Sequence, residues 1–349
     1  MIWGGESTLS LIDDQPWIIK RNPKALNKGL VCRALWQRYK LSKMARIEGC
    51  DLLFIPGGSY AGNFHPVVTM SQNLLPFEWR ELKRYGWTLF ALKLVVLRWI
   101  QTRTFRSSDG LIFLTEFARN AVLSVTGTLS ARCITIPHGL NQRFLVAPKP
   151  QRTIDNYNEL NPFRVLYVSI IDLYKHQSTV VEAIAAIRNA GYPVVLDLIG
   201  PAYQPALKHL QRVISRHAEN QPWVFYHGAV KFDELHLRYA EADLGLFASS
   251  CENMPNILLE MMASGLPIAC SNRGPMPEIL GPEGVYFDPE KSTDVAQAIF
   301  ALISSPQLRA QVANINYRNA KKYSWNNCAM DTFGFFSDIV NFSNRGGNV

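Results

Sequence analysis

Short apolar runs that alternate with segments of helical periodicity restrict the fold of this chain more than any other feature. In the first half they stand at residues 52–55, 67–70, 111–114 and 133–136. In the second half they stand at residues 163–168, 194–199, 224–226 and 244–247. Strands that alternate with helices favour an α/β protein whose parallel sheets are buried on both faces. A chain of 349 residues is long enough for two such domains.

A polar stretch between the two halves marks the predicted domain boundary. Residues 148–162 show no apolar periodicity and contain prolines at 148, 150 and 162, a composition typical of an exposed linker. We therefore predict an N-terminal domain at residues 1–150 and a C-terminal domain at residues 151–325. In the second domain, strand and helix alternate in the rhythm of a doubly wound sheet.

Composition narrows the class of protein. Hydrophobic residues make up 48% of the chain and charged residues 18%, so we expect a folded globular protein. None of the six cysteines lies in a C-x-x-C pair, which argues against a zinc site and favours reduced core cysteines of a cytoplasmic protein. The net charge of +8 favours anionic partners, which are nucleotides, nucleic acid or an anionic membrane surface.

The segment 249–267 carries the candidate chemistry. The strand at 244–247 ends in a polar loop, Pro255 stands where a first helical position is expected, and Gly265 is placed to end the helix. The start of this helix therefore points out of the carboxyl ends of parallel strands. In α/β folds ligands bind there, and the free N–H groups of the helix suit a phosphate.

Glu252 and Glu260 bracket this turn. A carboxylate next to a diphosphate is unfavourable unless its partners are hydroxyls, and an ionised carboxylate accepts two hydrogen bonds from the vicinal diol of a ribose or a hexose. The alternative interpretation is that Glu252 is a solvated loop residue and Glu260 a surface residue of the helix. The surrounding strand, loop, proline and glycine make the pair far more specific than its spacing alone.

The residues from 249 to 267 read S-S-C-E-N-M-P-N-I-L-L-E-M-M-A-S-G-L-P. This pattern resembles the hallmark of the family-4 retaining glycosyltransferases of the GT-B fold, a glutamate followed by seven residues and a second glutamate. The resemblance extends over residues 51–340 and is strongest from 163 to 290. It implies two doubly wound, Rossmann-like domains with a cleft between them, an N-terminal domain that binds the acceptor, and a final helix at 326–345 that crosses back to it.

The resemblance also implies a role for each residue of the turn. Glu252 would contact hydroxyls of the transferred sugar as a catalytic residue, and Glu260 would hold the ribose of the nucleotide. Asn253, Met254 and Pro255 would form the loop whose backbone faces the sugar and the diphosphate.

Two other segments of the C-terminal domain fit the same donor. Lys175 resembles the family's catalytic lysine, which stabilises the charge that develops on the departing diphosphate. The turn that ends at Val230 resembles the turn under the nucleotide base. Ile170 replaces an arginine that the family usually carries five residues before the lysine. We therefore expect a second cation from elsewhere, with Arg273 and Lys231 as candidates.

The sequence predicts a reaction without metal or cofactor. It contains no Asp-x-Asp, no phosphate loop and no dinucleotide fingerprint. The family's histidine after the second core strand is replaced by Gln72, which can bind a sugar hydroxyl but cannot accept a proton. This fits a front-face retaining mechanism, in which the donor phosphate takes the proton of the acceptor.

A basic segment in the first domain suggests an interaction surface. From residue 78 to residue 106, basic residues are interleaved with apolar ones at spacings of three and four, which predicts one amphipathic helix. Its expected apolar face consists of Leu82, Tyr85, Leu89, Leu92, Val96 and Trp99. Two interpretations stay open. The helix packs on the domain with a solvated basic face, or it also rests on the anionic inner leaflet of a membrane, as a peripheral contact.

The start of the chain is short compared with the family's first domain, which opens with a buried strand, a glycine-containing loop and a long helix. Before Asp51 the sequence offers Met1–Trp3 and a brief Gly4-Gly5, which predicts that the first strand and helix are missing. The other interpretation takes Gly4-Gly5 as the family's glycine loop.

The expected activity is that of a hexosyltransferase (EC 2.4). It would move a sugar from a nucleoside-diphosphate sugar to a hydroxyl of a glycan or a polyprenyl-linked acceptor, as in lipopolysaccharide and other cell-surface polysaccharide assembly. One alternative is a sugar-nucleotide epimerase of a similar fold, which would need acid–base carboxylates in the cleft. Another is a basic nucleic-acid-binding protein, which would need basic residues interleaved with aromatic ones. Neither explains the segment 249–267, so no nucleic-acid partner is expected.

Overall fold

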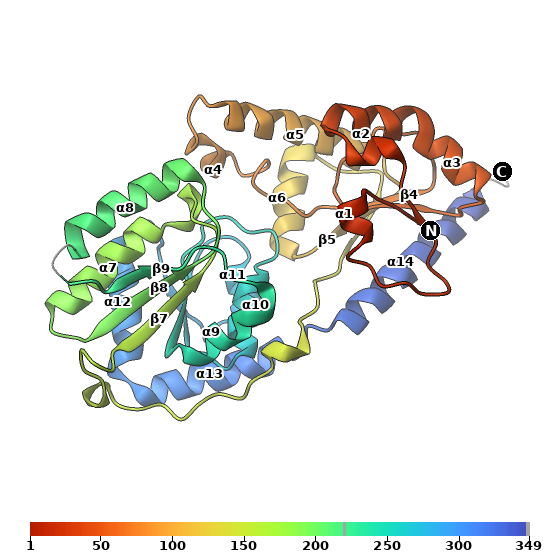
Figure 1. The fold of residues 1–349 in the computed structure, drawn as a ribbon. Helices are drawn as coiled ribbons and strands as arrows, with labels where there is room; N and C mark the ends of the chain where they lie inside the picture. The colour runs from red at the N-terminus through yellow and green to blue at the C-terminus, as the bar shows by residue number, and fades with distance from the viewer. Residues whose placement is uncertain (219–220, 347–349) are drawn as a thin grey trace.

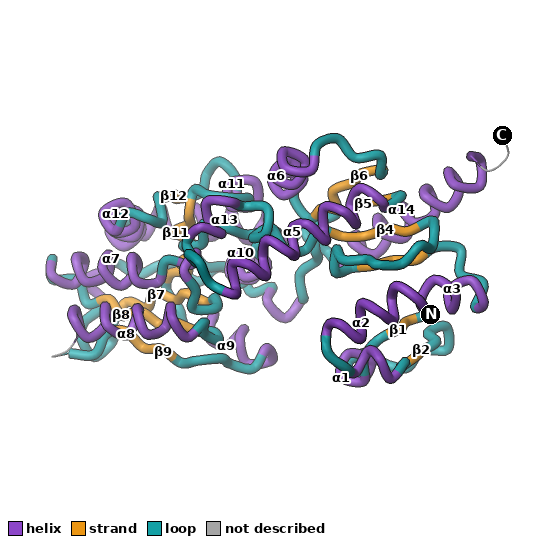
Figure 2. Tube along the Cα trace, turned by 90° about the horizontal axis from the view of Figure 1, so that it is seen from above, coloured by secondary structure: helices purple, strands orange, loops and turns teal. Residues whose placement is uncertain are grey.

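Two parallel sheets organise the molecule, each with helices packed around it (Figure 1). The computed structural model describes residues 1–218 and 221–346. Seen from above, the two α/β units lie beside each other and the chain passes between them through loops (Figure 2). The α/β class expected from the alternating pattern is confirmed.

The N-terminal unit is built on a four-stranded parallel sheet of order β3-β4-β5-β6. Its strands are β3 (Leu53–Ile55), β4 (Val67–Met70), β5 (Gly110–Phe113) and β6 (Arg132–Thr135). Its helices are α2 (Leu30–Trp36), α3 (Ser42–Ile47), α4 (Trp79–Lys83), α5 (Leu89–Ser107) and α6 (Glu116–Thr126). A π-helical turn, Gln37–Leu41, joins α2 to α3. Each apolar run predicted as a strand in this half overlaps one of these strands.

The C-terminal unit has a six-stranded parallel sheet of order β12-β11-β10-β7-β8-β9. Its strands are β7 (Phe163–Val168), β8 (Val194–Ile199), β9 (Val224–Tyr226), β10 (Leu244–Phe247), β11 (Ile268–Ser271) and β12 (Val285–Phe287). Its helices are α7 (Gln177–Asn189), α8 (Gln204–Ala218), α9 (Leu235–Glu241), α10 (Asn256–Ala263), α11 (Met276–Leu280), α12 (Ser292–Ser304) and α13 (Pro306–Ala320). The order reverses between β7 and β10, and in such sheets a crevice opens at the carboxyl ends of those strands.

The first residues form a small sheet of their own. Strand β1 (Ile2–Trp3) pairs in parallel with β2 (Lys20–Arg21) and leads into the four-residue helix α1 (Glu6–Leu9). Gly4 and Gly5 connect these two elements. A 3-10 turn, Lys24–Asn27, then leads to α2. Neither β1 nor β2 joins the four-stranded sheet.

The expected single helix from residue 78 to residue 106 is wrong. Gly86 has a φ of 57°, which a right-handed helix does not accommodate, and the chain forms α4 and α5 on either side of it. The apolar face predicted for α5 is also wrong. Leu89 is 87% exposed and Trp99 65%, because α5 packs on the domain through a second stripe that contains Leu94 and Phe105.

The expectation of buried cysteines holds for only part of the set. All six cysteines are free. Cys251 and Cys270 are buried in the C-terminal unit, whereas Cys32 on α2 is exposed. The remaining three are partly exposed. The scattered spacing of the cysteines therefore predicted that they form no disulfides, but it did not predict which of them are buried.

The last helix connects the two units. The chain crosses near Gly139, where an added Cβ would lie 2.1 Å from the backbone nitrogen of Trp325, so this crossing requires glycine. Helix α14 (Trp325–Gly346) starts there and runs along the N-terminal unit (Figure 1). Phe336 of α14 packs 5.0 Å from Phe54 of β3, ring centre to ring centre. Among the described residues, no helix combines the length and hydropathy needed to cross a bilayer.

Candidate functional site

The loop from β10 to α10 stands at the crevice where strand order reverses. Helix α10 begins at Asn256, and Pro255 occupies the position before the first helical residue, one place earlier than predicted. Gly265 ends the helix with a φ of 66°, as predicted. The linker also requires glycine there, because a Cβ would lie 2.6 Å from the nitrogen of Pro148.

The structure brings the two predicted catalytic residues into contact. Lys175 belongs to a 3-10 turn, Leu173–Lys175, in the loop after β7. Its Nζ contacts Oε1 of Glu252 in an ion pair. The side chains of Lys175 and Glu252 are only 8% and 16% exposed, so the interpretation of Glu252 as a solvated loop residue is wrong. A cation and a carboxylate that are removed from most of the solvent interact far more strongly than a surface pair.

A cavity of about 330 Å³ opens beside this pair, between the two units. It is lined from the N-terminal unit by Gln72, Asn73, Leu74, Leu75, Leu114 and His138, and from the C-terminal unit by Tyr174, Cys251, Glu252, Asn253, Met254 and Asn256. Gln72, expected to face the reacting sugar, therefore lies in the same cavity as Glu252. Polar groups from both units converge here, as a binding site for a donor and an acceptor requires.

Asn253 fixes this loop to the N-terminal unit. Its side-chain nitrogen donates to the carbonyl of Ser71 over 2.6 Å. Its own carbonyl accepts from the hydroxyl of Thr115 over 2.9 Å. Two of its polar groups thus bind the other domain and position the loop, whereas its side-chain oxygen is buried without a hydrogen-bond partner. The buried Met254 lines the cavity.

Glu260 lies inside the C-terminal unit and not on the helix surface. It is buried on α10 and accepts a hydrogen bond of 2.9 Å from the hydroxyl of Tyr239. Burial raises the pKa of Glu260 to about 7, and the Tyr239 hydrogen bond and the charge of Arg143 oppose this rise. Burial disfavours the ionised form of this carboxyl group, and groups whose pKa is shifted in this way are common at functional sites.

The other residues considered as contacts of the donor do not line this cavity. Val230 packs against the core in the turn after β9. Arg273, a candidate second cation, is held by both oxygens of Asp288 at 3.1 Å. Lys231 is exposed, and so is Ile170, which replaces the family's arginine.

His138 is a site residue that sequence reasoning missed. It follows β6 in a Pro-His-Gly turn and lines the cavity with Glu252. Its Nδ1 lies 3.3 Å from the side-chain nitrogen of Asn256, and burial lowers the pKa of the imidazole. Its position at the carboxyl end of a parallel strand was the signal that could have found it.

Metal ligands are not gathered at this site. Within residues 1–218 and 221–346, no three or more His, Cys, Asp or Glu side chains stand close enough to share a metal ion.

The buried Glu260 gives a testable pH dependence. Its pKa rises from 4.5 in the unfolded chain to about 7, so stability is lost as pH rises through 7, by about 3 kcal/mol in all. We expect Glu260→Gln to be more stable than the wild type at pH 8, with a smaller gain at pH 5. Urea unfolding at the two pH values measures this, with Glu182→Gln on the exposed side of α7 as the control. An equal gain at both values would contradict the account.

Comparison with known proteins finds similarity to glycosyltransferases. Residues 162–305 match the model of the family described as glycosyl transferases group 1. The chain is 29% identical over 114 residues to the O-antigen chain mannosyltransferase B of Escherichia coli, covering 33% of this chain and 30% of that one. It is 24% identical over 236 residues to the serotype-specific mannosyltransferase WbdA of Escherichia coli, covering 64% and 28%. The chain thus spans less than a third of the length of these two relatives.

Solved structures with the same architecture show the fold of the whole chain. Sucrose-phosphate synthase from Thermosynechococcus elongatus superposes with a TM-score of 0.74 at 17% identity, over 94% of this chain and 85% of that one. Anabaena Alr3699/HepE in complex with UDP and glucose superposes with a TM-score of 0.65 at 18% identity, over 84% and 80%. Residues 162–305 of this chain are thus similar to the glycosyl transferases group 1, and the chain as a whole has the two-domain GT-B fold.

Proposed function

We propose that this protein is a retaining glycosyltransferase. It transfers a hexosyl group from a nucleoside-diphosphate sugar to a hydroxyl of a glycan or a lipid-linked acceptor, in the assembly of a cell-surface polysaccharide. The observation that carries the proposal is the buried ion pair of Lys175 and Glu252, which stands beside a cavity between the domains at the carboxyl ends of β7 and β10.

Each member of the pair suits one part of the donor. Lys175 stabilises the negative charge that grows on the diphosphate as the bond from the anomeric carbon breaks. Glu252 accepts hydrogen bonds from hydroxyls of the sugar, whose partial positive charge in the transition state a carboxylate also stabilises. Glu260 is assigned to the ribose, and the backbone of residues 253–255 to the sugar and the diphosphate.

The reaction proceeds on one face of the sugar. The acceptor oxygen forms its bond to the anomeric carbon on the side from which the diphosphate leaves, and the acceptor proton passes to a diphosphate oxygen. Gln72 orients a hydroxyl in this scheme without taking its proton. No metal ion or cofactor has a role, because Lys175 supplies the charge that a metal would otherwise supply.

The relatives suggest which donors to test. Several are named mannosyltransferases, among them a GDP-mannose-dependent enzyme of Mycobacterium tuberculosis that is 26% identical over 231 residues, covering 62% of this chain and 57% of that enzyme. GDP-mannose is therefore the first donor for this protein, and UDP-glucose the second. An epimerase is disfavoured because the matching family model and the named relatives are glycosyltransferases.

Loss of Glu252 tests the proposal. We expect GDP-mannose or UDP-glucose to raise the melting temperature of the wild type. With that donor, Glu252→Gln should lower kcat by roughly 10²–10³, because one transition-state contact is lost. Kinetic assays in EDTA measure this, and Glu182→Gln is the control. A Glu252→Gln enzyme with full activity, or a wild type that stops in EDTA, would contradict the proposal.

A membrane contact completes the proposed location, which is cytoplasmic with peripheral binding to the inner leaflet. The outer face of α5 combines exposed apolar side chains with basic ones. These are Leu89, Leu92, Val96 and Trp99 together with Lys93 and the half-exposed Arg98. Helix α2, which lies along the same side of the domain in Figure 1, exposes Leu30, Val31 and Leu35. Apolar side chains flanked by cations suit the surface of an anionic bilayer.

Vesicle binding tests this location. We expect the wild type to float with phosphatidylglycerol vesicles and to be released by salt. The double variant Lys93→Glu/Arg98→Glu should bind less, whereas Lys208→Glu/Arg212→Glu on α8 is a matched control. Arg84 is unsuitable for this test because it pairs with Glu81 and Glu290. Binding that salt does not weaken, or no binding at all, would contradict the proposed contact.

A further inference from the structure

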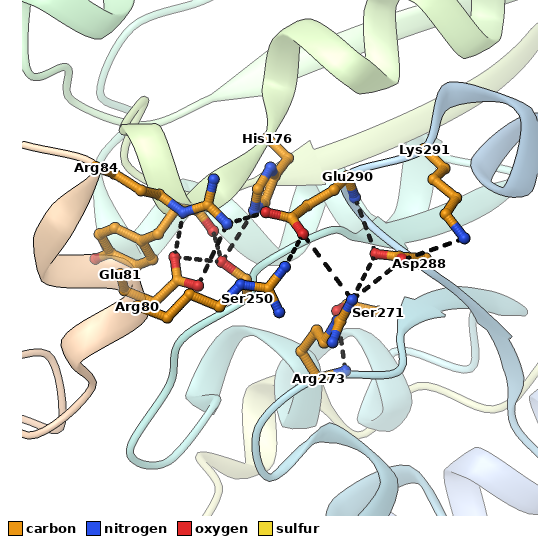
Figure 3. A network of polar contacts seen from close by, with 11 residues as sticks. Arg80, Glu81, Arg84, His176, Ser250, Ser271, Arg273, Asp288, Glu290 and Lys291 are labelled. Carbon is orange, nitrogen blue, oxygen red and sulfur yellow. Dashed lines mark hydrogen bonds and ion pairs between the residues drawn. The ribbon is translucent and has the colours of Figure 1, made fainter.

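Helix α4 of the N-terminal domain meets the C-terminal domain in a network of polar contacts (Figure 3). Arg80 and Arg84 both pair with Glu290, in the loop after β12. Arg84 also donates from Nε to Glu81 over 2.6 Å. The outer part of the network, formed by Arg273, Asp288 and Lys291, lies within the C-terminal domain. The cations of α4 thus approach loops at the carboxyl ends of the C-terminal strands.

Glu81 stands at the inner end of this network. It is buried, with 4% of the residue exposed. One of its carboxylate oxygens accepts the hydroxyl of Ser250 over 2.8 Å. Nε2 of His176 lies 2.9 Å from the same hydroxyl. A carboxylate of one domain is thus connected through one serine to a histidine of the other.

The proton positions along this chain follow from its chemistry. Burial lowers the pKa of His176 to about 4, so the imidazole is neutral and carries one N–H at neutral pH. A serine hydroxyl has a single proton, and the carboxylate of Glu81 can only accept it. The Ser250 hydroxyl therefore donates to the charged Glu81 at 2.8 Å and not to the more distant carbonyl of Tyr174 at 3.2 Å, and His176 donates from Nε2 to Ser250.

This chain links the two loops that carry the catalytic candidates. His176 directly follows Lys175, and Ser250 stands two residues before Glu252. The N–H of Ser250 also donates to the carbonyl of Tyr174 over 2.9 Å. The loop of Lys175 and the loop of Glu252 are therefore bonded to each other at Ser250, the residue that Glu81 contacts.

A second contact from the same region of the N-terminal domain supports the β7 loop. The hydroxyl of Tyr85 donates to Oδ1 of Asp172 over 2.9 Å. The same oxygen accepts the N–H of Leu173 and so caps the turn that ends at Lys175. The segment from Glu81 to Tyr85 thus supports the loop of Lys175 on one side and the loop of Glu252 on the other.

We propose that Glu81 is a positioning residue for glycosyl transfer: by accepting the hydroxyl of Ser250 across the cleft, it fixes the loops of Lys175 and Glu252 in the closed arrangement of the domains. This inference rests on the proposed function. Glu81 contacts neither the sugar nor the diphosphate in this scheme. It makes the geometry of the donor site depend on the N-terminal domain, which binds the acceptor.

Substitutions of Ser250 test the proposal with little risk to folding. Ser250→Ala removes the donor to Glu81, and Ser250→Thr keeps a hydroxyl. Arg80→Gln removes an outer, more exposed pair of the same helix and serves as the matched control. If a hydrogen bond to a charged group contributes fully to the transition state, its loss lowers the rate about tenfold or more.

We expect Ser250→Ala to lower kcat about tenfold or more with GDP-mannose or UDP-glucose, while the Kd for GDP or UDP is unchanged. Ser250→Thr should restore kcat, and Arg80→Gln should stay near the wild type. Without substrate, small-angle scattering should show a larger radius of gyration for Ser250→Ala than for Ser250→Thr. Wild-type kcat in Ser250→Ala, or a loss of kcat matched by weaker nucleotide binding, would overturn the positioning role.

The scattering result separates this inference from the proposed function. If the wild type binds neither nucleotide sugar, the proposed function fails. An expanded Ser250→Ala protein would then still support the role of Glu81 in holding the domains closed, and an unchanged radius of gyration would overturn it.

Discussion

The ion pair of Lys175 and Glu252 is the interaction on which the account of this site depends. Two opposite charges that are nearly out of solvent stabilise each other only if both are held in place, and removing one leaves the other buried without a partner. The loops after β7 and β10 meet that requirement because the reversal of strand order brings their ends together. In the proposed function, the same arrangement gives a donor a cation for its diphosphate and a carboxylate for its sugar.

The N-terminal domain completes this arrangement. Asn253 binds Ser71 and Thr115 across the cleft, and Glu81 binds Ser250. These contacts act on the loop that carries Glu252, on both sides of it. Residues of both domains therefore hold the loop of Glu252, and helix α14 returns to the N-terminal unit to connect the domains a second time. Apolar side chains of α5, among them Leu89 and Trp99, stay exposed on the same unit.

Local sequence patterns predicted what depends on neighbours in the chain. The strands with continuous apolar runs and the helix ended by Gly265 were accessible from such patterns. The placement of Lys175 and Glu252 at one site came from the family resemblance. Strand β11 was not recognised because Ile268 is its only large aliphatic residue. Strand β12 was overlooked although it is as long as the recognised β9. The face of α5 was misassigned because that helix carries two apolar stripes, and periodicity does not tell which one packs. Sequence reasoning missed Glu81 and His138 as site residues because their partners lie far away in the chain.

Binding of a nucleoside diphosphate without sugar tests the central claim most directly. In this account Glu252 and the diphosphate compete for Lys175. Titration calorimetry with GDP and UDP should therefore give opposite changes in affinity when Lys175 or Glu252 is substituted. Lys175→Ala should weaken binding, by about tenfold or more for the loss of a charged contact. Glu252→Gln should strengthen it, because Lys175 is released from its partner. Weaker binding in both variants, or none in the wild type, would contradict the assignment of Lys175 to the diphosphate and Glu252 to the sugar.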